Sequence, residues 1–502
     1  MTSMLQQFIR AKRLLRLRGQ AVLIGCFLLP FVLLFSQSAV AETAKHYTDL
    51  VFQPLPEVPV PPYTRFEMKN GMVVYLMEDH ELPLVSGTAL IRTGERLEPG
   101  AQVGLAEIMG TVMRSGGTQK HSADALNQLL EQRAASVETA IDSAFGSASF
   151  DTLTENLPQV FSLFSEVVRQ PLFPQDKIDL AKTQLRGSIA RRNDDPDDIA
   201  SREFQKLIYG NTSPYARTVE YATLNNVSRE SVLQFYQQYF YPNNFILGVV
   251  GDFDSKAMRS LIEKAFGDWQ PNSNFKKPAL PSVSQSKKGG VFFVDQPQLT
   301  QSYIQVGHLG GQLSSPDYGA LSVMNEVLNG FAGRLFNQIR SRQGLAYSVY
   351  AFWSPRFDYP GVFVAGGETR SDATVAFVRS LLAEIERIRT SPVSQQELTV
   401  AKDSVANSFV FNFQSRGQIL SRLLRYEYYG YPKDFLQRYR QAIAKTTIED
   451  VQRVANTYLK PENLVVLVVG NGSAINPPLA NLSPETKVTQ IDITIPQPQA
   501  GN

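Results

Sequence analysis

Cysteine is nearly absent from this chain of 502 residues, and histidine is scarce. The one cysteine, Cys26, lies in an apolar N-terminal segment that we expect to be removed. The mature chain should then hold neither a disulfide bond nor a thiolate metal site. The four histidines are His46, His80, His121 and His308. They are scattered and lack the spacing of metal ligands, and structural roles are favoured for His80 and His121.

A surplus of basic charge is missing as well. The N-terminal segment carries five basic residues and no acidic residue, so its removal leaves 44 basic against 47 acidic residues, a formal net charge of −3. A basic face is the first requirement of a protein that binds nucleic acid. No nucleic-acid partner is therefore expected.

The N-terminal segment has the pattern of a secretory signal. Basic residues precede the apolar run AVLIGCFLLPFVLLF (21–35), and the small residues of SAVAE (38–42) permit cleavage after Ala41. The run is short for a spanning helix and contains Pro30, which favours a cleaved signal over a retained anchor. We therefore expect an extracytoplasmic protein, in the periplasm or an equivalent lumen, that meets a membrane only if the signal stays uncleaved.

Two stretches of the chain repeat one another. SRESVLQFYQQYFYPNNFILGVVGD (228–252) and TIEDVQRVANTYLKPENLVVLVVGN (447–471) align without a gap at an offset of 219 residues. In each stretch, Ser228 or Thr447 is the predicted N-cap of a helix with an acidic residue in its first turn. A Tyr-x-x-Pro motif then ends the helix, and a β-branched run predicts a strand. Two homologous domains are therefore expected.

The expected organisation follows from this repeat. It comprises a signal peptide (1–41), a leader (42–62), an N-terminal domain (63–270), a linker rich in Pro, Ser, Lys and Gly (271–290), a C-terminal domain (291–472) and a tail (473–502). The last ten residues, ITIPQPQAGN, are expected to be frayed.

The hydrophobic periodicity predicts strands grouped with segregated helices, which indicates an α+β fold. In the first half, strands are predicted near 72–79 and 84–94 and as a hairpin over 136–150, with helices near 101–114, 122–134, 154–168, 174–192 and 196–208. In the second half, strands are predicted near 291–296, 302–308, 345–353 and 360–368, with helices near 315–329, 371–389, 394–413, 415–428 and 447–457.

An ordered series of segments carries a family resemblance. It includes NGMVVYLMEDHELPLVSGTALIRTGERLEP (70–99), GLAEIMGTVMRSGGT (104–118), RRNDDPDDIASREFQKLIYGNTSPYAR (191–217) and SSPDYGALSVMNEVLNGFAGRLFNQIRSRQGLAYSVYAFWSP (314–355). The series resembles the pitrilysin/insulinase family of inverted-motif zinc peptidases, in the branch of the mitochondrial processing peptidase and its paired bacterial homologues. The resemblance extends from about Tyr63 to Gly470. It implies two domains, each a mostly antiparallel sheet packed against a layer of helices.

Active members of that family carry H-x-x-E-H on a helix, with two histidines that bind zinc and a glutamate that acts as general base. A glutamate from a later helix completes the ligands. Aligned on GLA, this chain has Glu107, Gly110 and Thr111 at the first three positions, and Ser188 at the fourth. The resemblance therefore implies that this chain holds no zinc.

Active members also use an arginine and a tyrosine seven positions apart, which close over the substrate. RSRQGLAY supplies Arg340 and Tyr347 at that spacing. The alternative is a surface arginine on a helix over 333–342 and a tyrosine that packs on a sheet. In paired members one subunit carries the zinc helix and the other supplies the Arg/Tyr pair. The resemblance implies the second role here, with zinc on a homologous partner that has an intact H-x-x-E-H motif.

The resemblance also implies how an extended peptide or an unfolded segment would be held. Strand addition on an exposed sheet edge would use Ser136, Val137, Glu138, Thr139 and Ala140, although an ordinary covered strand explains them equally well. The glycines of NGFAGRL (329–335) fit a tight turn as readily as a substrate-guiding loop. Two functions therefore stay open: a non-catalytic peptidase subunit, and a scaffold or peptide-binding protein of a membrane-associated complex. An independent hydrolase is the weakest reading, because no catalytic triad or carboxylate pair stands out.

Overall fold

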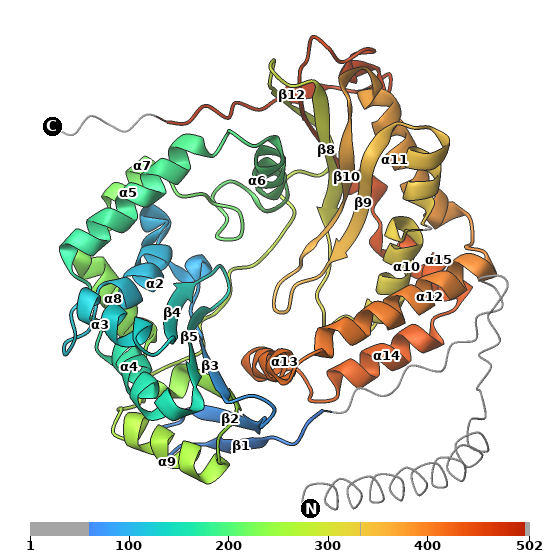
Figure 1. The fold of residues 1–502 in the computed structure, drawn as a ribbon. Coiled ribbons are helices and arrows are strands. Elements are labelled where there is room, and N and C mark those ends of the chain that lie inside the picture. Colours follow the sequence, from blue (N-terminus) through green and yellow to red (C-terminus); the bar gives the residue numbers. More distant parts are fainter. Residues whose placement is uncertain (1–59, 332, 497–502) are drawn as a thin grey trace, which may run out of the picture. The chain divides into compact units, whose positions relative to one another are not determined.

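Two six-stranded sheets, each packed against helices, form the protein in this computed structural model (Figure 1). The structure describes residues 60–331 and 333–496. The predicted signal peptide (1–41) and nearly all of the predicted leader (42–62) lie outside these ranges. Within them, no helix is both long enough and apolar enough to cross a membrane.

Both sheets are mostly antiparallel, and the predicted α+β class is confirmed. The first sheet has the order β1-β2-β6-β3-β5-β4, in which only β2 and β6 run parallel. The second has the order β12-β7-β11-β8-β10-β9, in which β7 runs parallel to both neighbours. The strands of the first sheet are β1 (Thr64–Glu67), β2 (Val73–Glu78), β3 (Leu84–Ile91), β4 (Ser136–Ile141), β5 (Gly146–Leu153) and β6 (Phe245–Gly251). Those of the second are β7 (Val291–Asp295), β8 (Gln301–Leu309), β9 (Ala346–Ser354), β10 (Val362–Arg370), β11 (Val465–Gly470) and β12 (Val488–Gln490).

The helices lie close to the predicted ranges. In the first half they are α2 (Leu105–Ser115), α3 (Ala123–Glu131), α4 (Leu157–Arg169), α5 (Gln175–Arg191), α6 (Pro196–Tyr209), α7 (Tyr221–Asn225), α8 (Arg229–Tyr239) and α9 (Ser255–Phe266). In the second half they are α10 (Tyr318–Asn329), α11 (Thr374–Thr390), α12 (Gln395–Val410), α13 (Arg416–Tyr429), α14 (Phe435–Lys445) and α15 (Ile448–Tyr458). The sequence pattern does not predict helices α7, α9 and α14 or strands β1 and β12.

The predicted repeat of helix and strand is confirmed. The Ser228 hydroxyl accepts a hydrogen bond from the Ser231 amide at 3.1 Å, and the Thr447 hydroxyl accepts one from the Asp450 amide at 3.2 Å. These bonds satisfy first-turn amides of α8 and α15. Each helix leads into a buried inner strand, β6 or β11.

One helix of each half packs on the sheet of the other half. Helix α6 packs on β8 and β11 of the second sheet, and α13 packs on β2, β3 and β6 of the first. Phe204 and Ile208 of α6 share a core with Leu467, while Leu420 and Leu424 of α13 belong to the core under the first sheet. The two halves are therefore joined by buried apolar surface as well as by the linker.

The end of the chain is more ordered than the sequence suggests. Strand β12 pairs with β7, and the amide of Ile491 donates to the carbonyl of Phe293 at 2.8 Å. The Asn193 side chain donates to the carbonyl of Ile493 at 2.8 Å, and Ile495 packs against the first core. The expectation of fraying from residue 493 is therefore wrong as far as Ile495, because alternate isoleucines find apolar surface that the sequence alone does not reveal.

We predict that a buried ion pair between the halves stabilises the fold. Arg96 donates to both carboxylate oxygens of Asp358 at 3.0 and 2.8 Å, and the Arg96 side chain is only 4% exposed. Asp358→Asn should lower the free energy of unfolding by about 3 kcal/mol, because it leaves a buried cation without its anion. Urea denaturation measures this loss.

The exposed pair of Arg259 and Glu263 on α9 is the matched control, since each side chain is 52% exposed. Glu263→Gln should change the free energy of unfolding by no more than about 0.5 kcal/mol. Equal losses in the two variants would contradict the role given to the Arg96–Asp358 pair.

Candidate functional site

Helix α2 begins against a carboxylate that lies upstream in the chain. Gly104, with φ of 101°, turns the backbone into the helix. The buried Glu98 accepts hydrogen bonds from the amides of Gly104 at 3.2 Å and Ala106 at 2.9 Å. These bonds satisfy donors that the first turn leaves free, and the negative charge suits the positive end of the helix dipole. The start of α2 is thereby fixed.

The apolar face of α2 sets the exposure of three of the four degenerate motif positions, Glu107, Gly110 and Thr111. Leu105, Ile108, Met109 and Val112 are buried in the first core. Residue Glu107 is partly buried, Gly110 is fully buried and Thr111 is exposed. Ser188 is exposed on α5, which packs against α2, and its hydroxyl donates to the carbonyl of Gln184 at 3.3 Å.

Gly110 is pressed against the backbone of strand β4. A Cβ atom at this position would lie 2.6 Å from the amide nitrogen of Ile141 and 3.0 Å from the carbonyl carbon of Ala140. The Thr139 hydroxyl donates to the Gly110 carbonyl at 2.6 Å. Helix and strand therefore meet where active relatives place the general base, and no side chain fits between them.

The residues at these positions do not suit zinc. Protein zinc sites use histidine nitrogen, cysteine sulfur and carboxylate oxygen, whereas Glu107, Thr111 and Ser188 offer one carboxylate and two hydroxyls. Within residues 60–331 and 333–496, no three His, Cys, Asp or Glu side chains are grouped so that they could hold a metal ion.

The surroundings of Glu107 are acidic. Burial raises the pKa of Glu107. The pKa of Glu95 is raised to about 7, first by burial and then by the charges of Glu98, Glu107 and Asp142. The Arg217 guanidinium donates to the backbone carbonyls of Glu95 and Glu98 at 2.8 and 2.7 Å, and its charge partly offsets this effect.

Strand β4 lies at the end of its sheet, and α2 covers part of its free edge. Arg114 donates from Nε to the carbonyl of Val137 at 2.7 Å, and from Nη2 to Asn127 at 2.9 Å. The exposed side chains of Glu138 and Ala140 are on this strand. One backbone acceptor of the proposed peptide-binding edge is therefore already in use.

Strand β9, the matching edge of the second sheet, is covered in the same way. The side-chain oxygen of Asn329 accepts from the amide of Ala351 at 3.0 Å, and that of Asn325 accepts from the amide of Trp353 at 2.6 Å. Both asparagines lie on α10 four residues apart, so they share one helical face. Helices α2 and α10 thus occupy equivalent sheet edges.

Arg340 and Tyr347 come together near the start of β9. Arg340 lies on the π-helical turn η6 (Phe336–Arg342), and its guanidinium carbon is 4.9 Å from the ring centroids of both Phe336 and Tyr347. Tyr347 is 84% exposed, and Phe331, whose ring lies tilted against that of Phe336, is 86% exposed. The two residues that the resemblance named are therefore in contact, with the tyrosine exposed and the arginine partly buried.

The glycine-containing segment 329–335 connects α10 to this cluster. Gly330 ends α10, and the buried Arg334 donates from Nε and Nη2 to the two carboxylate oxygens of Glu397 at 2.7 and 3.2 Å. A Cβ at Gly333 would lie 2.7 Å from the carbonyls of Gly330 and Leu328. The tight-turn reading of these glycines accounts for this geometry.

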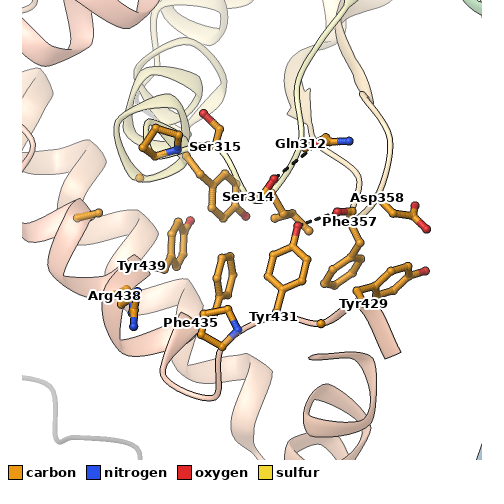
Figure 2. A pocket seen from close by; sticks show the side chains of 17 residues that line it. Gln312, Ser314, Ser315, Phe357, Asp358, Tyr429, Tyr431, Phe435, Arg438 and Tyr439 are labelled. Carbon is orange, nitrogen blue, oxygen red and sulfur yellow. Dashed lines mark hydrogen bonds between the residues drawn. The ribbon is translucent and has the colours of Figure 1, made fainter. Parts of the chain in front are cut away.

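The second half also contains an aromatic cavity that the sequence pattern did not predict. It has a volume of about 540 Å³ and lies beyond the end of α13 (Figure 2). The stretch YEYYGYPKDF (426–435) supplies several of its rings. This density of tyrosines was the signal available in the sequence.

Two family profiles match this chain. The profile described as "Insulinase (Peptidase family M16)" matches residues 73–222, and the one described as "Peptidase M16 inactive domain" matches residues 226–405. The chain belongs to the M16 peptidase family. This confirms the pitrilysin/insulinase family indicated by the motifs, whereas the processing-peptidase branch stays a prediction.

Individual relatives agree with the M16 assignment. A protein of Helicobacter pylori named "Non-peptidase homolog YmxG" is 24% identical over 81% of this chain and 94% of its own. A Bacillus subtilis protein named "Uncharacterized zinc protease YmxG" is 22% identical over 71% of this chain and 86% of its own. A solved structure from Pseudomonas fluorescens, titled as a peptidase M16 inactive domain, superposes with a TM-score of 0.71 at 23% identity, covering 82% of this chain and 98% of that one.

We predict opposite effects for alanine at two helical glycines of this M16 protein. Gly110→Ala should lower the free energy of unfolding by about 1–3 kcal/mol, because Cβ must push β4 away. Gly187 of α5 is the control, since a Cβ there would meet only Arg191 at 3.9 Å. Gly187→Ala should raise stability by up to about 1 kcal/mol through helix propensity. Chemical denaturation measures both, and a stabilising Gly110→Ala would contradict the contact.

A second prediction concerns pH. The pKa of Glu95 is raised to about 7 in the folded protein, whereas the pKa of a glutamate in an unfolded chain is about 4.3. The folded state therefore binds this proton more tightly than the unfolded chain does. Stability should therefore fall as pH rises from about 4.5 toward 7, by at most about 1.4 kcal/mol per pH unit. Glu95→Gln should flatten this part of the curve. Glu131→Gln, at an exposed glutamate of α3, should not; an unchanged slope in Glu95→Gln would refute the assignment.

Proposed function

We propose that this chain is the zinc-free, non-catalytic subunit of a heteromeric metalloendopeptidase. In this role it binds and positions an extended peptide and supplies Arg340 and Tyr347 to the zinc site of a homologous partner with an intact H-x-x-E-H motif. The secretory pattern of residues 1–41 places the complex outside the cytoplasm in this proposal.

The Arg340–Tyr347 cluster carries the proposal. A guanidinium over a phenol ring is a favourable contact that holds the two side chains as a unit. Tyr347 is 84% exposed, so it is available to another chain. A phenol can donate to an oxyanion that develops on a peptide carbonyl, and an arginine can orient a neighbouring carbonyl or carboxylate.

The packing of helix α2 against strand β4 supports the same assignment of roles to the two subunits. The contact of Gly110 with β4 leaves no room for a general base, and the donor set does not suit zinc. The metal chemistry of the complex would therefore belong to the partner alone. The name of the Helicobacter pylori relative, a non-peptidase homologue, is in line with this proposal.

A peptide added to β4 would have to compete with Arg114. The strand edge at Ser136–Ala140 is the proposed contact, and the guanidinium of Arg114 holds the carbonyl of Val137. Removal of the peptide from that edge would restore the Arg114 bond. Peptide binding at this edge should therefore be weaker than at an uncovered edge, because one hydrogen bond is exchanged for another.

The second candidate function is a non-enzymatic scaffold or peptide-binding protein of a membrane-associated complex. The scaffold form of this candidate is favoured by Arg114, Asn325 and Asn329, which bond to backbone groups on two strand edges. An edge that is covered in this way is protected from pairing with another chain. Pull-down with mass spectrometry separates the two. A partner with intact H-x-x-E-H supports the subunit, whereas membrane-complex proteins alone support the scaffold.

The subunit role predicts a specific loss of activity. With a zinc-bearing homologue from the same organism, the purified chain should restore cleavage of an unfolded peptide that neither protein cleaves alone. Tyr347→Phe and Arg340→Ala should each reduce kcat of the pair by roughly 10- to 100-fold, since each removes a group that faces the developing charge. A fluorogenic peptide assay measures the rate.

Arg342→Ala is the matched control for this assay. Arg342 is an exposed arginine on the same π-helical turn and bonds to Gln338 at 3.3 Å. Its loss should leave kcat within about twofold of that of the unaltered pair. This corresponds to a change of less than about 0.4 kcal/mol in the activation free energy. If Arg340→Ala and Tyr347→Phe behaved like Arg342→Ala, the role in trans would be lost.

A further inference from the structure

The aromatic cavity of the second half has no part in the function proposed above. Three segments wall it: residues 312–319 at the start of α10, Phe357 and Asp358 between β9 and β10, and residues 429–442 from the end of α13 into α14 (Figure 2). It shares no lining residue with the cluster of Arg340 and Tyr347. Its volume of about 540 Å³ lies in the range of roughly 300–1,000 Å³ that ligand sites have.

Six aromatic rings follow one another along the wall of this cavity. They are Tyr439, Tyr318, Phe435, Tyr431, Phe357 and Tyr429. The centroids of successive rings lie between 4.5 and 6.4 Å apart. The pairs at the two ends are stacked, and the two contacts of Tyr431 are edge-to-face. The six rings therefore form one continuous aromatic surface along the wall.

The charged side chains that line the cavity are already paired. Asp358 is held by both guanidinium nitrogens of Arg96, and Arg438 donates to Asp434 at 2.8 Å. These are the charged groups among the described lining residues. The cavity therefore offers no uncompensated charge to an ion.

Some of the neutral polar groups are engaged with the chain itself. The Tyr431 hydroxyl donates to the Phe357 carbonyl at 2.7 Å, and the Ser314 hydroxyl donates to the side-chain oxygen of Gln312 at 3.4 Å. A sugar needs many free donors and acceptors, because its hydroxyls would otherwise lose their bonds to water. The series of six rings and the paired charges favour a ligand that presents apolar faces and few donors.

We propose that this cavity binds a proline-rich segment of a partner polypeptide in the polyproline II conformation. A proline has no backbone N–H, so such a segment has few donors to satisfy, and its rings present flat apolar faces. The conformation is already extended in the free peptide, so binding costs little conformational entropy. Aromatic-lined grooves are the sites that recognise such segments. The proposal needs neither zinc nor a second M16 chain, so it stands or fails separately from the proposed function.

The test uses the purified chain and a fluorescein-labelled peptide of ten prolines, with fluorescence polarisation as the readout. Saturable binding is expected for this peptide and not for a labelled Gly-Ser peptide of equal length. Ser314→Trp places a large ring at an exposed lining position and should weaken binding by about tenfold or more. Phe357→Leu keeps an apolar side chain, removes one ring of the series and should also weaken binding.

Ser260→Trp is the matched control, because Ser260 is an exposed serine on α9, away from the cavity lining. It should bind the proline peptide like the unaltered chain. Circular dichroism verifies that each variant is folded. The proposal is overturned if the proline peptide does not bind, if the Gly-Ser peptide binds equally well, or if folded Ser314→Trp and Phe357→Leu both keep full affinity. Binding of a neutral oligosaccharide that Ser314→Trp abolishes, without binding of the proline peptide, would make the cavity a sugar site instead.

Discussion

The close contact between helix α2 and strand β4 determines which side chains this protein can hold at the degenerate zinc motif. At Gly110 the helix lies so near the backbone of Ala140 and Ile141 that only a hydrogen atom fits as a side chain. Thr139 bonds across the same junction, and Arg114, one turn further along α2, holds the carbonyl of Val137. The helix that carries the metal in active M16 members here packs against the edge strand of its sheet and is bonded to it.

The two halves of the molecule share one architecture but present different side chains at equivalent places. Helices α2 and α10 occupy equivalent places and each supplies side chains to an edge strand, through Arg114 in the first half and Asn325 and Asn329 in the second. The second half also carries the contacting pair of the partly buried Arg340 and the exposed Tyr347, which the proposed function assigns to another chain's active site. Helices α6 and α13, each packed on the opposite sheet, tie the halves together, so this pair is carried on a well-supported frame.

Local signals made much of this fold predictable from the sequence. Ser228 and Thr447 cap their helices as expected, because a cap depends on residues three positions apart. Local signals could not predict the contact of Gly110 with Ile141. They also could not predict that α6 and α13 each pack on the sheet of the opposite half. Both features depend on segments that only the folded chain brings together. The aromatic cavity is a similar case, since Tyr318, Phe357 and Tyr431 come from three separate segments. Arg340 and Tyr347 were named from the family resemblance; the structure shows that their side chains are in contact, and their role in catalysis stays a prediction.

The most direct test is a crystal structure of this chain bound to a homologue with an intact H-x-x-E-H motif, with zinc located by anomalous scattering. The account predicts one zinc ion in each pair, held by the partner's histidines, with the Tyr347 hydroxyl of this chain turned toward that metal. Zinc held by Glu107 and Thr111 of this chain would contradict it. A complex in which Tyr347 faces solvent, remote from the metal, would contradict it equally.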